Sequence, residues 1–342
     1  MIEPENIVII RTDRIGDVVL SLPMVDLIKK KYPDCRISFL VREYTKSLLE
    51  GNKSIDEIIV LKEKNRKIDF FGNLKTLKSR NFDSAILVSP TFRKALLLFL
   101  SGIKNRVGTG YRWYSFLFSK KINEHRKYGD KHELQLNVNM LKVFGIEEIL
   151  RESDVHFNIH VDESAKQKID NIFSQKGIDP QKPVVILHPG SGGSAIDLPL
   201  EKMRQLAAKL AQSLAYNVIV TGSKEEKDLC EKMTVDKNIF NFAGLFNLKE
   251  LIALIDRCSL MAANSTGPIH ITAALGKHVI GFYPKIDSCS PKRWGPFTEK
   301  KDIFTPELNC SNCTRKQCEN LNCMNSINID KVFKAIQNAL IK

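Results

Sequence analysis

The sequence has no long hydrophobic segment and no low-complexity tract. Its longest apolar run, residues 95–100, is far shorter than the about 20 residues that cross a bilayer as a helix. The first six residues are short and acidic and lack the basic and apolar parts of a secretory signal. These absences predict a soluble cytoplasmic protein and leave peripheral contact with a membrane open.

Glycine is scarce in the loop where a dinucleotide-binding protein needs it. An apolar strand is predicted at residues 7–10, and the loop after it, 11–17, holds one glycine. A dinucleotide loop carries several glycines so that a pyrophosphate can approach the backbone. This loop carries charged residues instead: Arg11, Asp13, Arg14 and Asp17. We interpret it as a loop that supplies a base, before a helix predicted to open near Val18.

Acidic residues are fewer than basic residues, and the excess of positive charge is unevenly distributed along the chain. The 342 residues include 52 Lys and Arg against 39 Asp and Glu, a net charge of +13. Residues 1–150 hold 27 basic against 18 acidic residues, and the remainder 25 against 21. The first half is therefore expected to meet an anionic partner: nucleic acid, phospholipid or a phosphorylated glycolipid. A lysine-rich solvated surface is the alternative, and no nucleic-acid-reading motif is present.

Strand and helix patterns alternate along two halves of the chain. This pattern indicates parallel βαβ units, and it restarts after a linker near residue 178. We predict an α/β fold of two Rossmann-like, doubly wound domains that face a cleft, at residues 1–160 and 178–325. Residues 157–161 are predicted as a strand. Residues 326–342 are predicted as a terminal helix that packs back on the N-terminal domain.

Two loops in the second half have the residue types of anion sites. Residues 188–194 and 264–270 each follow an apolar strand, and the second opens a helix. Glycines let a ligand approach backbone N–H groups, and hydroxyls add donors. Ordinary helix caps would have the same residue types. Two such loops on one sheet favour a diphosphate, bound by Ser191, Gly192, Gly193, Ser194, Ser265, Thr266, Gly267 and His270.

Four cysteines near the C-terminus follow the spacing C-x2-C-x4-C-x4-C: Cys310, Cys313, Cys318 and Cys323. Such spacing favours a tetrahedral zinc or iron–sulfur site, whose role would be structural. We predict that the tail binds no metal, and a structural metal site is the alternative. The other four cysteines are isolated along the chain and are expected to be buried.

Five segments in order resemble one known family. They are RTDRIGDVVLSLP (11–23), HPGSGGSAIDLP (188–199), TGSKEE (221–226), NSTGPIHITAALG (264–276) and the cysteine tail. Together they resemble glycosyltransferase family 9, the bacterial heptosyltransferases of lipopolysaccharide core assembly and their relatives. The resemblance implies a GT-B fold, an ADP-heptose donor, inversion at the anomeric carbon, an anionic glycolipid acceptor, and no required metal or cofactor.

The resemblance also implies roles for single residues. Asp17 matches the catalytic aspartate of the family, Arg11 a basic position beside it, and Asp13 is the rival base. A helix N-cap is the alternative role for Asp17. Either Glu225 or Glu226 matches an acid that contacts the nucleoside, unless it serves only the helix dipole.

Two positions depart from the family pattern. The family commonly has Lys or Arg before the proline of the second motif, where this chain has Ile196, and an aromatic residue where it has Leu198. Arg11, Lys224 or Arg293 would have to compensate for the missing cation. The rival hypotheses are therefore a hexose transferase or epimerase with another nucleotide sugar, and a catalytically weak sugar-nucleotide-binding protein. Because no D-x-D pair occurs, a metal-bridged diphosphate site of the GT-A type is disfavoured.

The acceptor is expected on the basic half. Residues 110–121 interleave aromatic and basic side chains, which suits an anionic membrane surface or a lipid-linked acceptor as well as it suits a half-buried loop. We assign acceptor binding to Arg14, Arg112 and Arg293. Peripheral contact with the inner leaflet of the cytoplasmic membrane follows from the same stretch.

Overall fold

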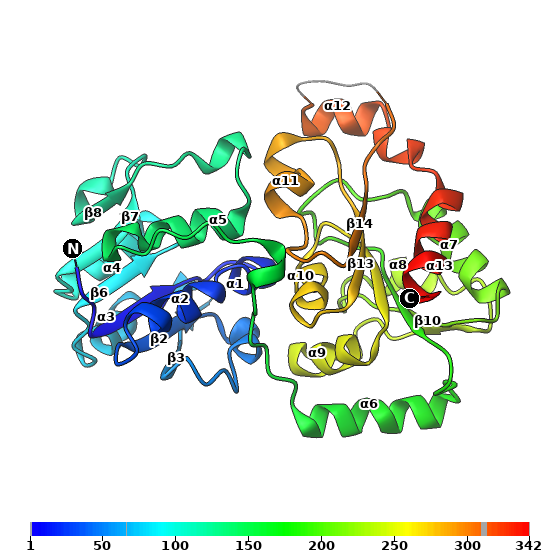
Figure 1. Cartoon of the computed structure of the whole chain (residues 1–342), viewed down its shortest axis with the longest axis horizontal. Helices are drawn as coiled ribbons and strands as arrows, with labels where there is room; N and C mark the ends of the chain where they lie inside the picture. The colour runs from blue at the N-terminus through cyan, green and yellow to red at the C-terminus, as the bar shows by residue number, and fades with distance from the viewer. Residues whose placement is uncertain (1, 66, 309–312, 342) are drawn as a thin grey trace. The chain divides into compact units, whose positions relative to one another are not determined.

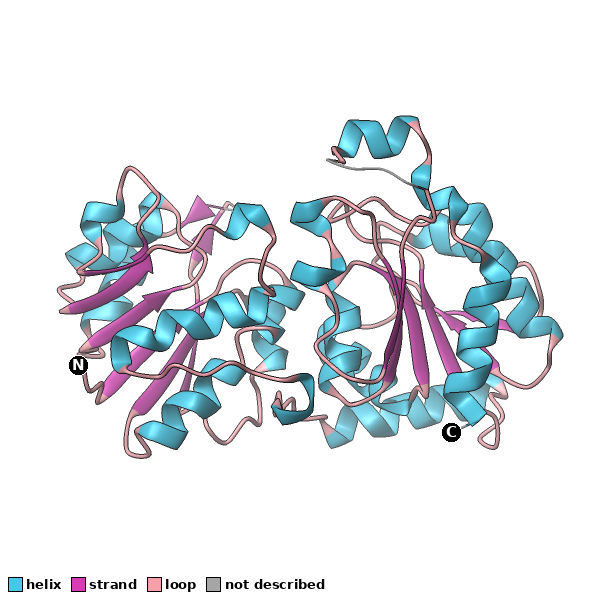
Figure 2. Ribbon diagram, turned by 45° about the horizontal axis from the view of Figure 1, so that its top comes forward, coloured by secondary structure: helices cyan, strands magenta, loops and turns pink. Residues whose placement is uncertain are grey.

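The chain divides into two compact units, each built on one parallel sheet (Figure 1). The structure is a computed structural model, and it describes residues 2–65, 67–308 and 313–341. The first unit comprises residues up to 127 with 131–160, and the second comprises 128–130 with 161 to the end. Helices cover both faces of each sheet (Figure 2). The predicted α/β fold with two doubly wound sheets is confirmed.

The first unit has a six-stranded parallel sheet in the order β3-β2-β1-β6-β7-β8. Its strands are β1 (Asn6–Ile10), β2 (Arg36–Val41), β3 (Glu57–Val60), β6 (Ser84–Leu87), β7 (Asn105–Thr109) and β8 (Lys120–Ile122). A small hairpin is formed by β4 (Glu63–Lys64) and β5 (Lys67–Ile68). The helices are α1 (Ile15–Val19), α2 (Pro23–Lys31), α3 (Phe70–Lys78), α4 (Phe92–Leu100) and α5 (Glu133–Val138), which a 3-10 helix, η4 (Asn139–Phe144), continues.

The second unit repeats this topology in the order β11-β10-β9-β12-β13-β14. Its strands are β9 (Val184–His188), β10 (Asn217–Val220), β11 (Ile239–Asn241), β12 (Leu260–Asn264), β13 (His278–Phe282) and β14 (Lys301–Phe304). Its helices are α6 (Glu163–Lys176), α7 (Leu200–Gln212), α8 (Lys227–Glu231), α9 (Leu248–Arg257), α10 (Gly267–Ala274), α11 (Pro291–Trp294), α12 (Arg315–Asn320) and α13 (Ile329–Ile341). In both units the strand order reverses beside the central strand, at β1 and β9, which is where such sheets bind ligands.

Three local predictions are wrong. The helix predicted from Val18 begins at Ile15 and ends at Val19, and α2 starts only at Pro23, which suits the first position of a new helix because it has no N–H. Residues 157–161 alternate in polarity but pair with no strand. The edge strands β8 and β14 were not expected, since their polar sequences KKI and KDIF carry no apolar run.

The terminal helix α13 packs within the second unit. Its buried residues Val332 and Ile336 belong to the apolar core that also contains residues of α7 and β13. The predicted contact of this helix with the N-terminal domain stays a prediction. Within the described residues, every helix is too short or too polar to pass through a bilayer.

Candidate functional site

The loop after β1 is organised around the side chain of Arg11, which is almost completely buried. Its Nε lies 2.9 Å from the carboxylate of Asp13, and its Nη2 contacts the carboxylates of Asp17 and, at 3.2 Å, Glu133. A buried guanidinium needs partners for its charge and its N–H groups. Burial alone would lower the pKa of Arg11, but the three carboxylates outweigh burial and raise it. Arg11 is thus a permanent cation that fixes the acids around it.

Helix α5 completes this cluster. The Oδ1 of Asn137 accepts hydrogen bonds from Arg11 at 3.3 Å and from Arg126 at 2.9 Å. Its Nδ2 donates to the carbonyl of Leu20 at 3.0 Å, and Arg126 also contacts the buried carboxylate of Glu133. Glu133 and Asn137 are four residues apart and so share one helix face. We call the following six residues the Arg11 cluster: Arg11, Asp13, Asp17, Arg126, Glu133 and Asn137.

Asp17 lies in the first turn of α1, but it does not cap that helix. The N-cap residue is Arg14, and the Asp17 carboxylate contacts Arg11 instead. The side chain is 15% exposed, against 31% for Asp13. Burial raises the pKa of Asp17; the Arg11 guanidinium opposes this effect, and the carboxylates of Asp13 and Glu133 add to it. A carboxylate with a raised pKa is a better proton acceptor near neutral pH.

A buried lysine that sequence reasoning missed lies beside this loop. Lys94, on α4, is 6% exposed, and its Nζ donates to the hydroxyls of Thr12 at 3.2 Å and Ser89 at 3.0 Å. Burial lowers its pKa to about 8; the charge of Asp13 opposes this shift, and that of Arg11 adds to it. A cation held at such a cost beside a loop of acids indicates a functional position.

We expect Lys94→Met to stabilise the protein and to lower its activity. A pKa that falls from 10.5 to about 8 corresponds to about 3 kcal/mol of unfavourable burial at neutral pH. Methionine removes that cost and two hydrogen bonds, so the net gain in unfolding free energy is roughly 1 to 3 kcal/mol. The gain should shrink as pH rises from 8 towards 10.5, because the folded wild type then carries a neutral lysine. Urea unfolding measured at several pH values tests this, with the exposed Lys104→Met as the control. A less stable Lys94→Met variant would contradict it.

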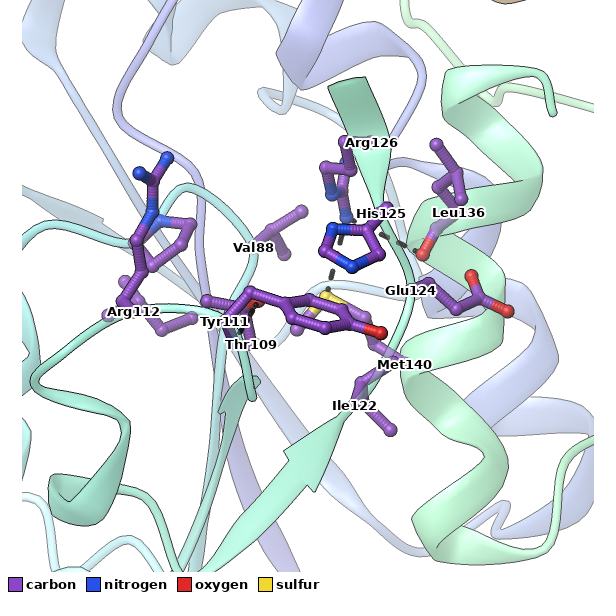
Figure 3. Close-up of a pocket in the computed structure, with 12 residues that line it drawn as sticks. Val88, Thr109, Tyr111, Arg112, Ile122, Glu124, His125, Arg126, Leu136 and Met140 are labelled. Carbon is purple, nitrogen blue, oxygen red and sulfur yellow. Dashed lines mark hydrogen bonds between the residues drawn. The ribbon is translucent and has the colours of Figure 1, made fainter. Parts of the chain in front are cut away.

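The first unit has a cavity of about 400 Å³ at the carboxyl ends of β6, β7 and β8 (Figure 3). The rings of Tyr111 and His125 stack in it, with centroids 3.4 Å apart. Arg126 forms part of its wall, where it donates to the carbonyl of Leu136 at 3.5 Å and lies 3.6 Å from the sulfur of Met140. Because Arg126 also belongs to the Arg11 cluster, it connects the wall of the cavity to the carboxylates of that cluster.

The three arginines assigned to the acceptor lie in different places. Arg112 lines the cavity, and Arg14 is exposed beside α1. Arg293 belongs to α11 in the second unit, where its guanidinium lies 4.9 Å from the ring centre of Trp294. Within the first unit, the structure places Arg112 in the wall of the cavity.

In the second unit, Asn264 holds the loop of residues 189–199 against the end of β12. Its buried amide donates to the carbonyl of Pro189 at 2.5 Å and accepts from the N–H of Leu198 at 2.8 Å. The hydroxyl of Ser194 donates to the carbonyls of Ser191 at 2.7 Å and Ser265 at 2.8 Å. The two predicted anion loops are therefore joined by direct hydrogen bonds.

The turn of this loop leaves room for a ligand. Gly192 and Gly193 both have positive φ, +55° and +74°, and a Cβ added at either would meet no atom within 4 Å. Ser191 is buried beside them. The loop after β12 adds Thr266 and the N-terminus of α10, whose cap makes no side-chain hydrogen bond. These features fit the anion site predicted from the sequence.

Two predicted residues are already engaged with protein. The side chain of Ser265 hydrogen bonds to Tyr283, whose pKa is raised by burial. His270 is buried inside α10.

The two adjacent glutamates separate clearly. Glu225 is exposed, whereas a carboxylate oxygen of Glu226 accepts from the N–H of Ser223 at 2.8 Å. A Cβ at Gly190 would collide with the Glu226 carboxylate. Burial lowers the pKa of the neighbouring His188, and the charge of Glu226 opposes this. Glu226 is thus the acid that faces the loop of residues 189–199.

The cysteine tail packs beside the same loop. Cys318 and Cys323 form an apolar cluster with Ile286, against which Ile196, Cys289 and Cys313 pack. Cys310 lies outside the described residues. Within the described chain, no three His, Cys, Asp or Glu side chains gather as ligands for a metal ion.

Sequence reasoning also missed the cluster members Arg126, Glu133 and Asn137, and Asn264 as the clamp of the loop. Glu133 and Asn137 follow an i, i+4 spacing, which on its own equally describes a solvated helix face. Their contact with Arg11 spans more than 120 positions, so only the fold brings it about.

Comparison with known proteins shows to which family this chain belongs. The family model described as glycosyltransferase family 9 (heptosyltransferase) matches residues 72–324. A candidate glycosyltransferase of Haemophilus influenzae is 28% identical over 312 residues, which are 88% of this chain and 89% of that protein. The lipopolysaccharide core heptosyltransferase OpsX of the same species is 26% identical, with 88% and 84% covered. The structure of E. coli ADP-heptose LPS heptosyltransferase II superposes with a TM-score of 0.81 at 19% identity, covering 98% of each chain. The two parallel-sheet units are those of the GT-B fold, and because the family match spans well over half of its length, the chain belongs to glycosyltransferase family 9.

Proposed function

We propose that this glycosyltransferase moves a heptose, or a related sugar, from ADP-heptose to lipopolysaccharide core or another cell-envelope glycan. The observation that carries the proposal is Asp17, fixed by the buried Arg11 in a cluster that borders a cavity of sugar size. The names of the relatives support the sugar and the donor. We propose inversion and metal independence from the family resemblance, and the absence of a D-x-D pair supports the latter.

In the proposed reaction, Asp17 accepts the proton of an acceptor hydroxyl while the hydroxyl oxygen attacks the anomeric carbon. The bond from that carbon to the diphosphate oxygen breaks, and the nucleoside diphosphate leaves with the bonding electrons. Arg11 holds the Asp17 carboxylate, and Asp13 is the rival base. Fixed charges of this kind stabilise a transition state because they need not reorganise during the reaction.

The donor is proposed to bind in the second unit. The open turn at Gly192 and Gly193, with Ser191, Ser194, Ser265, Thr266, Gly267 and His270 around it, would hold the diphosphate. Backbone N–H groups at such a turn and at a helix N-terminus attract anions. Glu226 is the better placed of the two glutamates to meet the nucleoside, because it faces this loop while Glu225 faces solvent.

The acceptor is proposed to bind in the cavity of the first unit. The stacked pair Tyr111 and His125 offers a flat apolar surface, and Glu124, Arg112 and Arg126 offer polar groups at its edge. Ligand sites commonly combine an apolar lining with a few polar groups that fix orientation. A sugar ring that carries an anionic group fits this combination.

A neighbouring surface supports peripheral contact with the inner leaflet of the cytoplasmic membrane. Trp113 and Phe116 are 72% and 65% exposed, and Trp113 stacks on Phe92 with ring centres 4.8 Å apart. Lys120 and Lys121 are exposed nearby in sequence, on β8. Aromatic side chains flanked by basic ones are typical of proteins that bind anionic interfaces.

The proposal is tested by binding and by transfer. In a thermal-shift panel of ADP, UDP, GDP and CMP, we expect ADP to raise the melting temperature most, because a ligand that binds only the native state stabilises it. Incubation with ADP-heptose and a lipopolysaccharide core acceptor should then yield a glycoside of inverted anomeric configuration, also in the presence of a chelator.

Other results would select the rivals. Stabilisation by UDP with transfer from a UDP-sugar would replace the heptosyltransferase assignment with a hexose transferase. Interconversion of a nucleotide sugar without an acceptor would indicate an epimerase. Binding of ADP without any turnover would indicate a sugar-nucleotide-binding protein.

A further inference from the structure

The loop of residues 189–199, where the donor diphosphate is proposed to bind, lacks a cation of its own. Residues 189–199 contain no lysine and no arginine. Ile196, in the middle of this loop, packs against the apolar core and the cysteine cluster. A diphosphate bound at this loop would carry at least two negative charges, which backbone dipoles neutralise only in part.

An arginine from a distant part of the chain reaches this loop. Arg315 begins α12, and its Nη2 donates a hydrogen bond to the carbonyl of Gly193 at 3.3 Å. Gly193 is the second glycine of the open turn, where an added side chain would meet nothing. The guanidinium has five N–H donors: Nη2 donates to Gly193, and Nη1 lies 3.7 Å from the exposed carboxylate of Glu319, while half of the arginine side chain is exposed. It can therefore donate to a ligand without leaving the loop.

The position of Arg315 is set by the buried cysteines. Cys318, on the same helix, and Cys323 pack with Ile286, and Ile196 packs against this cluster. The hydroxyl of Thr314 accepts from the N–H of Gln317 and so caps α12. Ile196, in the loop, therefore contacts the segment that carries Arg315.

The charge of Arg315 acts across the loop. Burial raises the pKa of Asp197 and the charge of Glu226 adds to this, while the charge of Arg315 opposes it. The field of the guanidinium thus extends from Gly193 to the other end of the loop. A bound diphosphate would lie within the same field.

We propose that Arg315 binds the diphosphate of the donor and supplies the cation that residues 189–199 lack. This assignment rests on the proposed function, because it presumes a nucleoside diphosphate in this loop. It gives the cysteine segment a role in donor binding as the support of Arg315. Arginine suits the task because its planar fork matches phosphate oxygens in pairs.

The experiment compares three probes by calorimetric titration of the full chain: ADP, AMP and adenosine. For Arg315→Ala we expect the dissociation constant for ADP to rise about 10- to 100-fold, as the loss of charge-assisted hydrogen bonds predicts. The effect on AMP should be smaller, and adenosine should bind as it does to wild type. Arg315→Lys should fall between alanine and wild type. The matched control is Lys316→Ala, one position along the same exposed helix.

The results that would contradict the proposed function and those that would contradict this inference alone are different. If wild type binds no nucleoside diphosphate, the proposed function fails and this inference with it. If wild type binds ADP and Arg315→Ala binds it equally, the inference alone fails. An equal loss for ADP and adenosine would show that Arg315 only shapes the loop, which also overturns it.

Discussion

Asp17→Asn is expected to lower the rate of sugar transfer by roughly 10²- to 10⁴-fold, the usual contribution of a general base. The amide oxygen can still accept from Arg11, so the loop should keep its shape. Donor affinity should stay within about twofold, because an interaction used only in the transition state affects kcat and not ground-state binding. Steady-state kinetics with ADP titration separate the two quantities.

The control for this substitution is Asp13→Asn. Asp13 contacts the same guanidinium but is more exposed. A larger loss in Asp13→Asn than in Asp17→Asn would transfer the role of base to Asp13. Equal activity of Asp17→Asn and wild type would remove Asp17 from the reaction.

The pH dependence of kcat/KM should reflect the ionisation of Asp17. Since burial raises the pKa of Asp17, the acid limb of kcat/KM should lie above the ordinary aspartate value of 3.8. The base must be unprotonated, so activity falls as pH drops through the raised pKa. An Asp17→Asn variant should lose this limb from its residual activity.

Both sheets could be predicted from the sequence because each strand buried on both faces is a short apolar run between turns. VVIL at the start of β9 and IVII in β1 are such runs, and their helices follow at regular distances. The strands β8 and β14 lie at the edge of their sheets with one neighbouring strand each, and their polar sequences lack this signal. Helix ends were misplaced where a proline interrupts one apolar pattern, as at Pro23.

Half of the site could be predicted for a similar reason. Asp17 follows β1 and the turn at Gly192 follows β9, each at the carboxyl end of the strand beside which its own sheet reverses order, so the topology locates them. Lys94, Glu133 and Arg315 follow no such rule. Each reaches its place through contacts between segments 80 or more positions apart, and its local pattern equals that of a surface residue. Their burial or anchoring is visible only in the fold.

The largest effect on stability is expected for Arg11→Met. Breaking a buried ion pair by removing one partner costs roughly 3 to 5 kcal/mol, because the remaining charge is left without compensation. Here three carboxylates lose their shared cation, and Arg126 remains in contact with the carboxylate of Glu133. Methionine keeps most of the volume, so the loss should reflect charge and not a cavity. Urea unfolding followed by circular dichroism measures it.

A second substitution distinguishes charge from packing. Glu133 is the most buried of the three carboxylates, so Glu133→Gln should restore part of the stability of Arg11→Met. Lower pH should do the same, because without Arg11 the buried carboxylates bind protons more readily in the folded state than in the unfolded state. The deficit of Arg11→Met should therefore shrink as pH falls from 7 towards 5. A deficit that stays constant with pH, and that Glu133→Gln does not reduce, would mean that Arg11 acts by its volume. The same guanidinium also holds the carboxylate of Asp17. If the loss of charge is the cause, Arg11→Met should therefore lose activity together with stability.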